Sequence, residues 1–446
     1  MDLSIGVWTI ILFGLMFAVL ATGLPVVFVL GGIAMALSIL IFGINATIGL
    51  YMNVWAGFIT QMLLAVPLFI LMASVLQYSG IADDAYDMFY KWMGGLRGGL
   101  AMGTVLICTI FAAVTGTSGA ATVSMGLIAI PSMLKRGYDK RMIVGGVAAG
   151  GVLGLLIPPS IIMIIYSLIA HLSIGKMFMG GIFPGLVASF LYVLYIGIRC
   201  WRNPELGPPL PVEERATWSM KLVSLKALML PIILIIAVLG SIWFGVATPT
   251  EAAAVGAFGG FICAIIHRRF NLTLLRTASL QALRLTSMIF WIMAGAIAFS
   301  NLYIQLGARD MIGELVTGLH LNPWLILILM QISLLILGCL MDDVAVIMLA
   351  GPIYIPIIET LGFNPLWFGI LFIMNMNIAY LTPPYGFNLF YLRGLTPVIR
   401  EQTGVEITMG DIYHAVVPFV GLQIIALAIV MVFPSLATWL PGKMFG

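Results

Sequence analysis

The sequence predicts an all-α polytopic membrane protein built from inverted repeats, with two re-entrant helical hairpins and two discontinuous helices. Three observations support this fold class. The 446 residues are 62% hydrophobic and only 8% charged, whereas soluble domains carry roughly 25% charged residues. Apolar segments long enough to enter or cross a bilayer recur along the whole chain. Helix-breaking residues recur at a fixed spacing in the two halves.

So little charge cannot cover a water-exposed surface, so the apolar surface must face a lipid bilayer. The net charge of +3 is small, and no basic tract indicates nucleic acid. The four cysteines lie far apart in apolar stretches, without metal or redox spacing, and are expected to be small buried side chains. The first residues, Met1 and Asp2, lack the basic character of a cleavable signal, so we expect the first apolar stretch to be a span.

The two halves of the chain are related by a shift of 225 positions. Under that shift Gly126 falls on Gly351, Pro131 on Pro356, Gly137 on Gly362 and Pro158-Pro159 on Pro383-Pro384. A random apolar sequence would not place its helix-breaking glycines and prolines at matching positions in the two halves. A two-fold internal repeat is typical of secondary transporters.

Charge predicts how the halves are oriented. The turn 135–141 carries four basic residues, and its repeat partner 359–365 carries none. By the positive-inside rule the first turn is cytoplasmic and the second lies outside. Equivalent turns on opposite sides make the repeat inverted.

Each half contains a small polar tip between two short apolar segments. The tips are 115–119 (Thr-Gly-Thr-Ser-Gly) and 338–343 (Gly-Cys-Leu-Met-Asp-Asp). The flanking segments are shorter than the roughly 20 residues of a full span. We therefore predict two re-entrant helical hairpins. Irregular backbone at that depth persists only where protein, ions or water satisfy it.

A double proline then interrupts the next helix of each half, at 157–160 and at 381–385. Proline lacks an N–H and clashes with the carbonyl four residues back, so two in a row unwind the helix and free carbonyls. Freed carbonyls suit a small hard cation such as Na⁺, and half-helix N-termini favour an anion. A mere kink is the alternative, but the recurrence of the break beside a tip favours ion binding.

Several polar residues near these elements have two possible roles. Asp342 and Asp343 are either solvated at an interface or functional, and intramembrane carboxylates are usually functional. The amides of Asn375 and Asn377 orient a substrate or bridge helices. Arg393 pairs with a substrate carboxylate or anchors the chain at the cytoplasmic face.

At these residues the chain closely resembles the large (M) membrane subunit of the TRAP transporters, the tripartite ATP-independent periplasmic family. The resemblance covers essentially the whole chain. It is carried by Thr115-Gly116-Thr117, Ile157-Pro158-Pro159-Ser160, Met341-Asp342 and Thr382-Pro383-Pro384 with Gly386 and Asn388.

The resemblance implies Na⁺-coupled uptake of an organic carboxylate, such as a C4-dicarboxylate, across the bacterial inner membrane. It also implies an elevator-type fold, in which a transport domain moves against a scaffold. The stretch 391–397 resembles members that handle 2-oxo or hydroxy acids. The implied partners are a small membrane (Q) subunit, expected as a separate polypeptide, and a periplasmic substrate-binding (P) protein.

The family's arrangement implies specific site residues in this chain. A first Na⁺ site uses backbone carbonyls of Thr115, Thr117, Gly154, Ile157 and Pro159. The repeat offset maps a second Na⁺ site onto Leu340, Asp342, Ala379, Thr382 and Pro384. The candidate substrate contacts are Ser118, Ser160, Asp343, Asn375, Asn377 and Arg393. Members often have Ser-Gly-Ser where this chain has Thr-Gly-Thr, a change that preserves carbonyl ligation and puts hydroxyl contacts in doubt.

The resemblance also divides the chain into parts. The expected parts are N-terminal scaffold spans with an interfacial helix at 1–97, a first transport repeat at 98–198, a polar linker at 199–226, a second scaffold part at 227–306, a second transport repeat at 307–410 and a C-terminal span at 411–446.

Three other functions remain open on the sequence alone. A stand-alone Na⁺/dicarboxylate symporter would have similar hairpins but no binding protein. An ion channel is another possibility. An intramembrane enzyme would need a nucleophile or metal motif. The sequence has no His-Glu-x-x-His, Gly-x-Ser-x-Gly or paired-cysteine motif, so we do not expect an enzyme.

Overall fold

The computed structural model describes residues 4–308, 311, 321–383 and 386–444, and within these ranges the chain is helical and has no strand. The helices of the first half are α1 (Ile5–Leu20), α2 (Val26–Phe42), α3 (Ala46–Phe58), α4 (Ala65–Tyr78), α5 (Ile81–Met93), α6 (Gly99–Thr115), α7 (Ser118–Leu134), α8 (Lys140–Val152), α9 (Ile161–Ile169) and α10 (Ile174–Arg202). Those of the second half are α11 (Trp218–Ser224), α12 (Lys226–Trp243), α13 (Pro249–Ile266), α14 (Leu272–Gln305), α16 (Pro323–Gly338), α17 (Asp343–Thr360), α18 (Pro365–Leu381), α19 (Phe387–Thr403), α20 (Met409–Val432) and α21 (Ser435–Gly442). Short 3₁₀ turns are η1 (Gln61–Leu64), η2 (Leu153–Leu155), η3 (Pro204–Leu206) and η4 (Val212–Glu214).

Six helical segments in the described ranges are long and apolar enough to cross a membrane, and a seventh is formed if the bent pair α11–α12 counts as one span. The six are Gln61–Tyr78, Ile174–Arg202, Pro249–Ile266, Leu272–Gln305, Asp343–Thr360 and Met409–Val432. Large apolar side chains such as Ile10, Leu40 and Phe190 lie exposed on the outer surface, as lipid-facing residues do. The all-α polytopic fold class is therefore confirmed.

The predicted repeat is visible in where helices begin. Ser118 starts α7 and Asp343 starts α17, and Lys140 starts α8 and Pro365 starts α18, both at the predicted offset. The repeat also reaches further than the sequence indicated, because α2 and α13 begin at nearly equivalent positions. One difference breaks the symmetry, since α3 and α4 are separated at η1 whereas the single long helix α14 occupies their equivalent positions.

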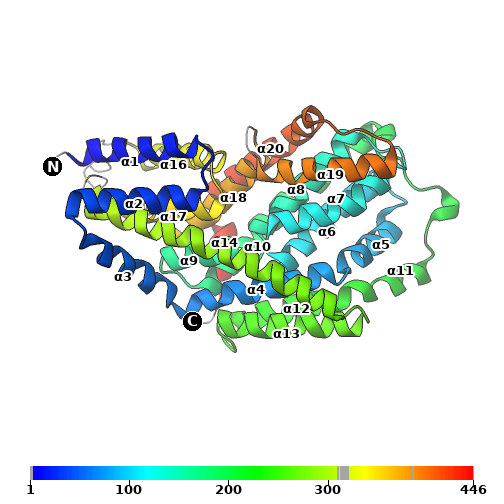
Figure 1. The fold of residues 1–446 in the computed structure, drawn as a ribbon. Helices are drawn as coiled ribbons and strands as arrows, with labels where there is room; N and C mark the ends of the chain where they lie inside the picture. The colour runs from blue at the N-terminus through cyan, green and yellow to red at the C-terminus, as the bar shows by residue number, and fades with distance from the viewer. Residues whose placement is uncertain (1–3, 309–310, 312–320, 384–385, 445–446) are drawn as a thin grey trace.

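The two hairpins lie on opposite sides of the molecule (Figure 1). The α6–α7 pair lies toward the side that carries α5 and α11, and the α16–α17 pair lies beside α1 and α2. This arrangement agrees with an inverted repeat. The re-entry of the hairpins into the bilayer and the inside–outside assignment remain predictions.

The tips and breaks in the structure differ slightly from the ranges that the sequence predicted for them. Thr115 and Ser118 are already helical, so only Gly116 and Thr117 are unwound at the first tip. The second tip likewise shortens to 339–342. The first break starts earlier than expected, because α8 ends at Val152 and tightens into η2 before the double proline. A pattern of helix-breaking residues locates helix ends only to within a residue or two.

The polar linker is ordered against the helix ends rather than extended between two halves. The N–H of Gly98 donates to the Gly207 carbonyl at 2.8 Å, and the N–H of Asp139 donates to the Leu206 carbonyl at 2.9 Å. Arg136 in the basic turn pairs with Glu214 at 2.8 Å. The linker thus binds to the turn that the charge rule assigns to the cytoplasm, and its last part forms α11.

Close packing of α2 on α14 depends on glycine. A Cβ on Gly295 of α14 would stand 2.7 Å from the Val27 carbonyl and 3.2 Å from the Gly31 nitrogen of α2. Small residues allow such backbone approach, which is a main source of helix association in lipid.

We expect Gly295→Ala to force α2 and α14 apart, because the added methyl group meets backbone that cannot rotate away. The estimated loss is about 1–3 kcal/mol of stability, measured as a lower Tm of the purified protein in lipid nanodiscs. Gly240→Ala in α12 is the matched control, since a Cβ there meets nothing within 4 Å. Equal Tm values for the two variants would contradict this account of the α2–α14 contact.

Candidate functional site

The first tip and the first break are in direct backbone contact. A Cβ on Gly116 would stand 2.4 Å from the Pro159 carbonyl oxygen, and Gly116 has a positive φ of 60° that favours glycine. A Cβ on Gly154 would stand 2.6 Å from the Thr117 carbonyl oxygen. A glycine of each element therefore lies against a backbone carbonyl of the other.

Four of the five predicted residues of the first Na⁺ site gather here. Thr115 is buried, and its Oγ1 donates to the Phe111 carbonyl at 3.0 Å and contacts the Thr117 carbonyl oxygen at 3.4 Å. Pro158 cannot donate to the Gly154 carbonyl, four residues back, so that oxygen loses its helical partner. The Ile157 side chain instead packs against Gly185 of α10, where a Cβ would lie 2.6 Å from Ile157 Cγ1.

The break is stabilised locally by a serine. Ser160 is fully buried, and its hydroxyl donates to the Leu155 carbonyl at 2.6 Å. That carbonyl is the one that Pro159 leaves without a helical donor. Ser160 thus satisfies the broken backbone, a role different from the predicted substrate contact.

The second tip is built on two aspartates. Asp342 Oδ1 accepts the N–H groups of Val344 at 2.6 Å and Ala345 at 3.0 Å, which caps α17. Asp343 is buried, and its Oδ1 accepts the Val344 N–H at 2.9 Å. The helix before this tip, α16, ends against α18, because a Cβ on Gly338 would stand 2.7 Å from the Ala379 Cβ.

The second break follows α18 as predicted. Thr382 ends the helix, and its Oγ1 donates to the Ile378 carbonyl at 2.7 Å. Gly386 has a φ of 38°, and its Cβ would stand 3.2 Å from the Thr382 carbonyl oxygen. Pro384 lies outside the described residues. The Leu340 side chain is about half exposed, at 47%, so any ligation by this residue would come from its backbone.

One tyrosine of the second half lies on the first tip. Tyr391 of α19 has its Cε2 and hydroxyl 2.9 and 3.4 Å from where a Gly119 Cβ would stand. Near the start of the same helix, the Phe387 ring packs on the Tyr380 ring of α18 at 5.2 Å between centroids. The helices around the second break therefore reach the first tip.

A buried amide connects the two broken helices. Asn388 Nδ2 of α19 donates to the Ala148 carbonyl of α8 at 2.9 Å, across 240 residues of sequence. Gly151 makes room for this contact, since a Cβ there would stand 1.9 Å from Thr122 Oγ1 and 3.2 Å from Asn388 Nδ2. The hydroxyl of Thr122 and the Oδ1 of Asn388 are both buried without a hydrogen-bond partner in the described part of the chain.

The remaining predicted substrate contacts are dispersed. Asn375 Nδ2 donates to the backbone carbonyl and Oε1 of Gln331, at 2.7 and 2.8 Å, so this amide bridges α18 and α16. Asn377 is fully buried and neither of its amide atoms has a partner among the described residues. Arg393 points away from the tips toward a polar pocket with Arg400 and Glu406, and its Nη1 lies 3.5 Å from the Ile407 carbonyl. Ser118 is buried at the start of α7.

Sequence reasoning missed Tyr380, Tyr391 and the bond made by Asn388. The spacing of Phe387 and Tyr391 places both on one face of α19, which is the only signal available in the sequence. Nothing local indicates that this face meets Gly119, because the contact joins opposite halves of the chain. No group of three His, Cys, Asp or Glu side chains that could hold a metal occurs in the described ranges.

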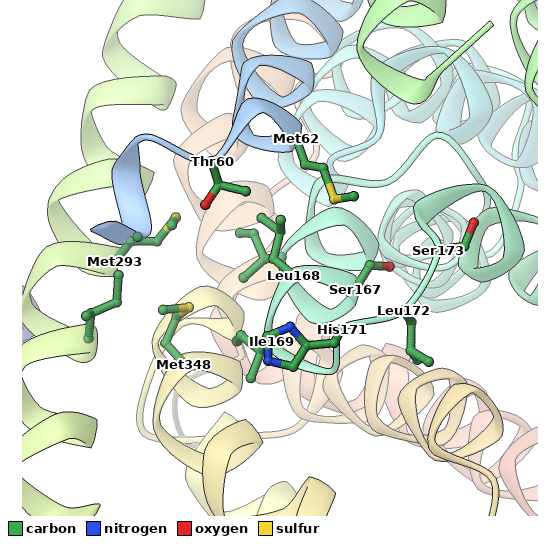
Figure 2. A pocket seen from close by; sticks show the side chains of 13 residues that line it. Thr60, Met62, Ser167, Leu168, Ile169, His171, Leu172, Ser173, Met293 and Met348 are labelled. Carbon is green, nitrogen blue, oxygen red and sulfur yellow. The ribbon is translucent and has the colours of Figure 1, made fainter. Parts of the chain in front are cut away.

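A cavity lies apart from the tips (Figure 2). Its volume is about 590 Å³, and it separates α3 and α14 on one side from the end of α9 and α17 on the other. Met293 of α14 and Met348 of α17 both line it, and Leu168 and His171 line it from the end of α9. Close by, Ser300 Oγ of α14 donates to the Met348 carbonyl at 3.1 Å. The contact between α14 and the second hairpin is therefore incomplete.

Comparison with known proteins gives a consistent result. The family described as the tripartite ATP-independent periplasmic transporter, DctM component, matches residues 13–436. The C4-dicarboxylate TRAP transporter large permease protein DctM of Pseudomonas aeruginosa is 34% identical, over 92% of this chain and 93% of its own. The isethionate TRAP transporter permease protein DctMQ of Oleidesulfovibrio alaskensis is 32% identical, over 85% of this chain and 58% of its own.

A solved structure shares the fold. The YdaH transporter of Alcanivorax borkumensis aligns with a TM-score of 0.61 over 89% of this chain and 90% of its own, at 14% sequence identity. At that identity the likeness concerns the fold alone.

We expect Asn388→Ala to loosen the junction of the two broken helices, because it removes a buried cross-half hydrogen bond. The expected loss is about 1–3 kcal/mol, accompanied by faster amide hydrogen exchange in residues 150–160. Asn301→Ala is the matched control, since its Nδ2 bonds the Ile297 carbonyl at 2.8 Å within one helix. Unchanged exchange at 150–160 in Asn388→Ala would contradict the role of Asn388 as a tie between the halves.

Proposed function

The chain belongs to the DctM component family of tripartite ATP-independent periplasmic transporters, and from that premise we propose that it couples the uptake of an organic carboxylate to a Na⁺ gradient. It is a multi-pass membrane transporter component and not an enzyme. The proposed cargo is a carboxylate such as a 2-oxo or hydroxy acid, carried across the inner membrane.

The observation that carries the proposal is the contact between the first tip and the first break. Gly116 lies against the Pro159 carbonyl oxygen and Gly154 lies against the Thr117 carbonyl oxygen, and neither the tip nor the break contains a charged side chain. Na⁺ is a hard cation that binds such oxygens without needing a carboxylate. A Na⁺ ion bound there would fix the tip in one conformation and so prepare the adjacent cargo site.

The second Na⁺ site is proposed at the equivalent contact of the other half. Gly338 meets Ala379, and Asp342 holds the start of α17, so the tip and the break are neighbours here too. The two proposed ions would drive uptake with about 2.3 kcal/mol per charge for each 100 mV of membrane potential, in addition to their concentration gradient.

The proposed movement is of the elevator type. The hairpins and broken helices would move as one body against α2, α4, α13 and α14. The cavity between α14 and α17 suits such a sliding contact, because a gap there leaves few interactions to break. A small Q subunit and a periplasmic P protein are the proposed partners. The alternative, a symporter that works without a binding protein, is less favoured because the chain belongs to a tripartite family.

The direct test is uptake into proteoliposomes that contain the chain with its small subunit, supplied with the binding protein. We expect accumulation with an inward Na⁺ gradient and none when K⁺ replaces Na⁺. Gly154→Ala places a methyl group against the Thr117 carbonyl, so it should lower Na⁺ affinity roughly tenfold or more, a loss of about 1.4 kcal/mol or more.

Gly146→Ala in α8 is the control for that substitution, since its Cβ would meet nothing closer than 3.7 Å. It should transport as the unchanged protein does. Uptake that is equal in Na⁺ and K⁺ would refute sodium coupling, and uptake that needs no binding protein would favour the stand-alone symporter.

A second test concerns the sliding contact. Met293→Trp should fill part of the cavity and slow uptake severalfold, because a packed contact must be broken in each cycle, while Na⁺ binding stays unchanged. Met288→Trp is the control, because Met288 lies on the same helix and is half exposed on its outer side. An unchanged uptake rate in Met293→Trp would argue against movement across this surface.

A further inference from the structure

We propose that the cavity between α14 and α17 holds an acyl chain of a membrane phospholipid, with the lipid headgroup at the turn between α9 and α10. The cavity has a volume of about 590 Å³ and lies where the second hairpin approaches α14 (Figure 2). Its occupant would form part of the surface along which the proposed movement takes place. The inference concerns a lipid site and does not depend on which ion or cargo the chain carries.

The cavity separates two pairs of helices that are each closely packed. A Cβ on Gly57 of α3 would stand 2.7 Å from Ile297 Cδ1 of α14. A Cβ on Gly351 of α17 would stand 3.1 Å from Ile169 Cγ2 of α9. Ile297 and Ile169 also line the cavity. The gap therefore lies between the two pairs, and a guest there leaves the packing within each pair undisturbed.

The interior of the cavity suits a hydrocarbon chain. Most of its lining is apolar and includes Ile165, Leu168, Ile169, Met293, Ile297 and Met348. Among the described residues that line it, none is Lys, Arg, Asp or Glu, so a carboxylate cargo would find no compensating charge. The Ser167 hydroxyl already donates to the Met163 carbonyl at 2.8 Å. Water would lack the several polar partners that it needs in a buried site, so the expected guest is apolar.

The volume selects among apolar guests. An apolar cavity of about 150 Å³ holds a benzene molecule, so this larger cavity accepts a longer guest. A helix of roughly 10 Å diameter uses the same volume in about one and a half turns, so a span of the small subunit does not fit. An empty cavity would deprive its lining of dispersion contacts. A flexible acyl chain restores these contacts without fixing the two walls to each other.

The cavity adjoins a surface that faces lipid. Gly57, Thr60 and Met62 line it from the segment that joins α3 to α4, and Met62 is 47% exposed. Trp55 and Ile59 on the same segment are also exposed. Large apolar side chains with such exposure are expected where a protein meets the bilayer. The bilayer is therefore the adjacent source of a guest, and an acyl chain can enter past Met62.

A histidine marks the headgroup end of the site. His171 lines the cavity just after α9, with a left-handed φ of 52°. Glycine is the usual residue at such a position, because a side chain there adds strain. A histidine that keeps this strain indicates a use for its side chain. Its ring is exposed and has no hydrogen-bond partner in the part of the chain that the structure describes, so it can bond the phosphate of a lipid.

Photocrosslinking tests the site directly. The full chain with its small subunit would be placed in nanodiscs of phosphatidylethanolamine and phosphatidylglycerol, with a small fraction of phosphatidylethanolamine that carries a diazirine in the middle of one acyl chain. Mass spectrometry after illumination locates the lipid adducts. We expect adducts on Ile297 and Met348 inside the cavity, as well as on the exposed Phe190 of α10. Adducts confined to outward-facing residues such as Phe190 would overturn the proposal.

Met293→Trp should fill part of the cavity and lower the yield of adducts on Met348 severalfold, while the yield on Phe190 stays the same. Met288→Trp is the matched control, because Met288 lies on the same helix and is half exposed, so the yield on Met348 should not change. A yield on Met348 that Met293→Trp leaves intact would contradict an acyl chain in this cavity.

His171→Gly tests the headgroup end, because it relieves the backbone strain and removes the imidazole. It should lower the yield on Met348 severalfold without lowering Tm. Arg268→Gly is the matched control, since Arg268 also has a positive φ, of 56°, and does not line the cavity. Equal yields in these two variants would overturn the headgroup assignment. These measurements need neither Na⁺ nor cargo, so a negative result leaves the proposed function standing.

Discussion

Backbone polar groups inside a bilayer must find partners, and this requirement explains where the chain is irregular. Each half breaks its helical hydrogen bonding twice, once at a hairpin tip and once at a double proline, and each interruption would be costly if it faced lipid. In the first half the two interruptions meet, with Gly116 on the Pro159 carbonyl and Gly154 on the Thr117 carbonyl. Only glycine permits that approach. The irregular backbone is therefore gathered in the interior, where the same oxygens that need partners become available to a cation.

Symmetry of the fold does not extend to its chemistry. Ser118 and Asp343 occupy equivalent positions at the starts of α7 and α17, yet one end is neutral and uncapped and the other is capped by two carboxylates. Tyr391 and Asn388, both on α19, connect the elements of one half to those of the other.

The sequence predicted what is determined locally. Double prolines and glycines with positive φ interrupt helices locally, so the positions of the tips, the breaks and the repeat followed from residues such as Pro158, Pro159 and Gly116. The contacts that turn these breaks into a site could not be predicted in the same way. Asn388 reaches Ala148 across 240 residues, and Tyr391 reaches Gly119 from the other half. Of the two roles left open for Asn375, the structure shows the bridging one, through Gln331, and Arg393 faces Ile407 rather than the tips. Such outcomes depend on how the halves pack, which composition and spacing do not encode.

The central claim is that the carbonyls brought together at the first tip and first break bind Na⁺. The most direct measurement is a pair of high-resolution cryo-EM maps of the membrane complex, one prepared in Na⁺ and one in choline. The account predicts a density peak in the Na⁺ map, surrounded by the backbone oxygens of Thr117, Gly154 and Pro159, and a loosened tip in the choline map. Identical density at Gly116 and Thr117 in both maps, with no peak between the tip and the break, would contradict it.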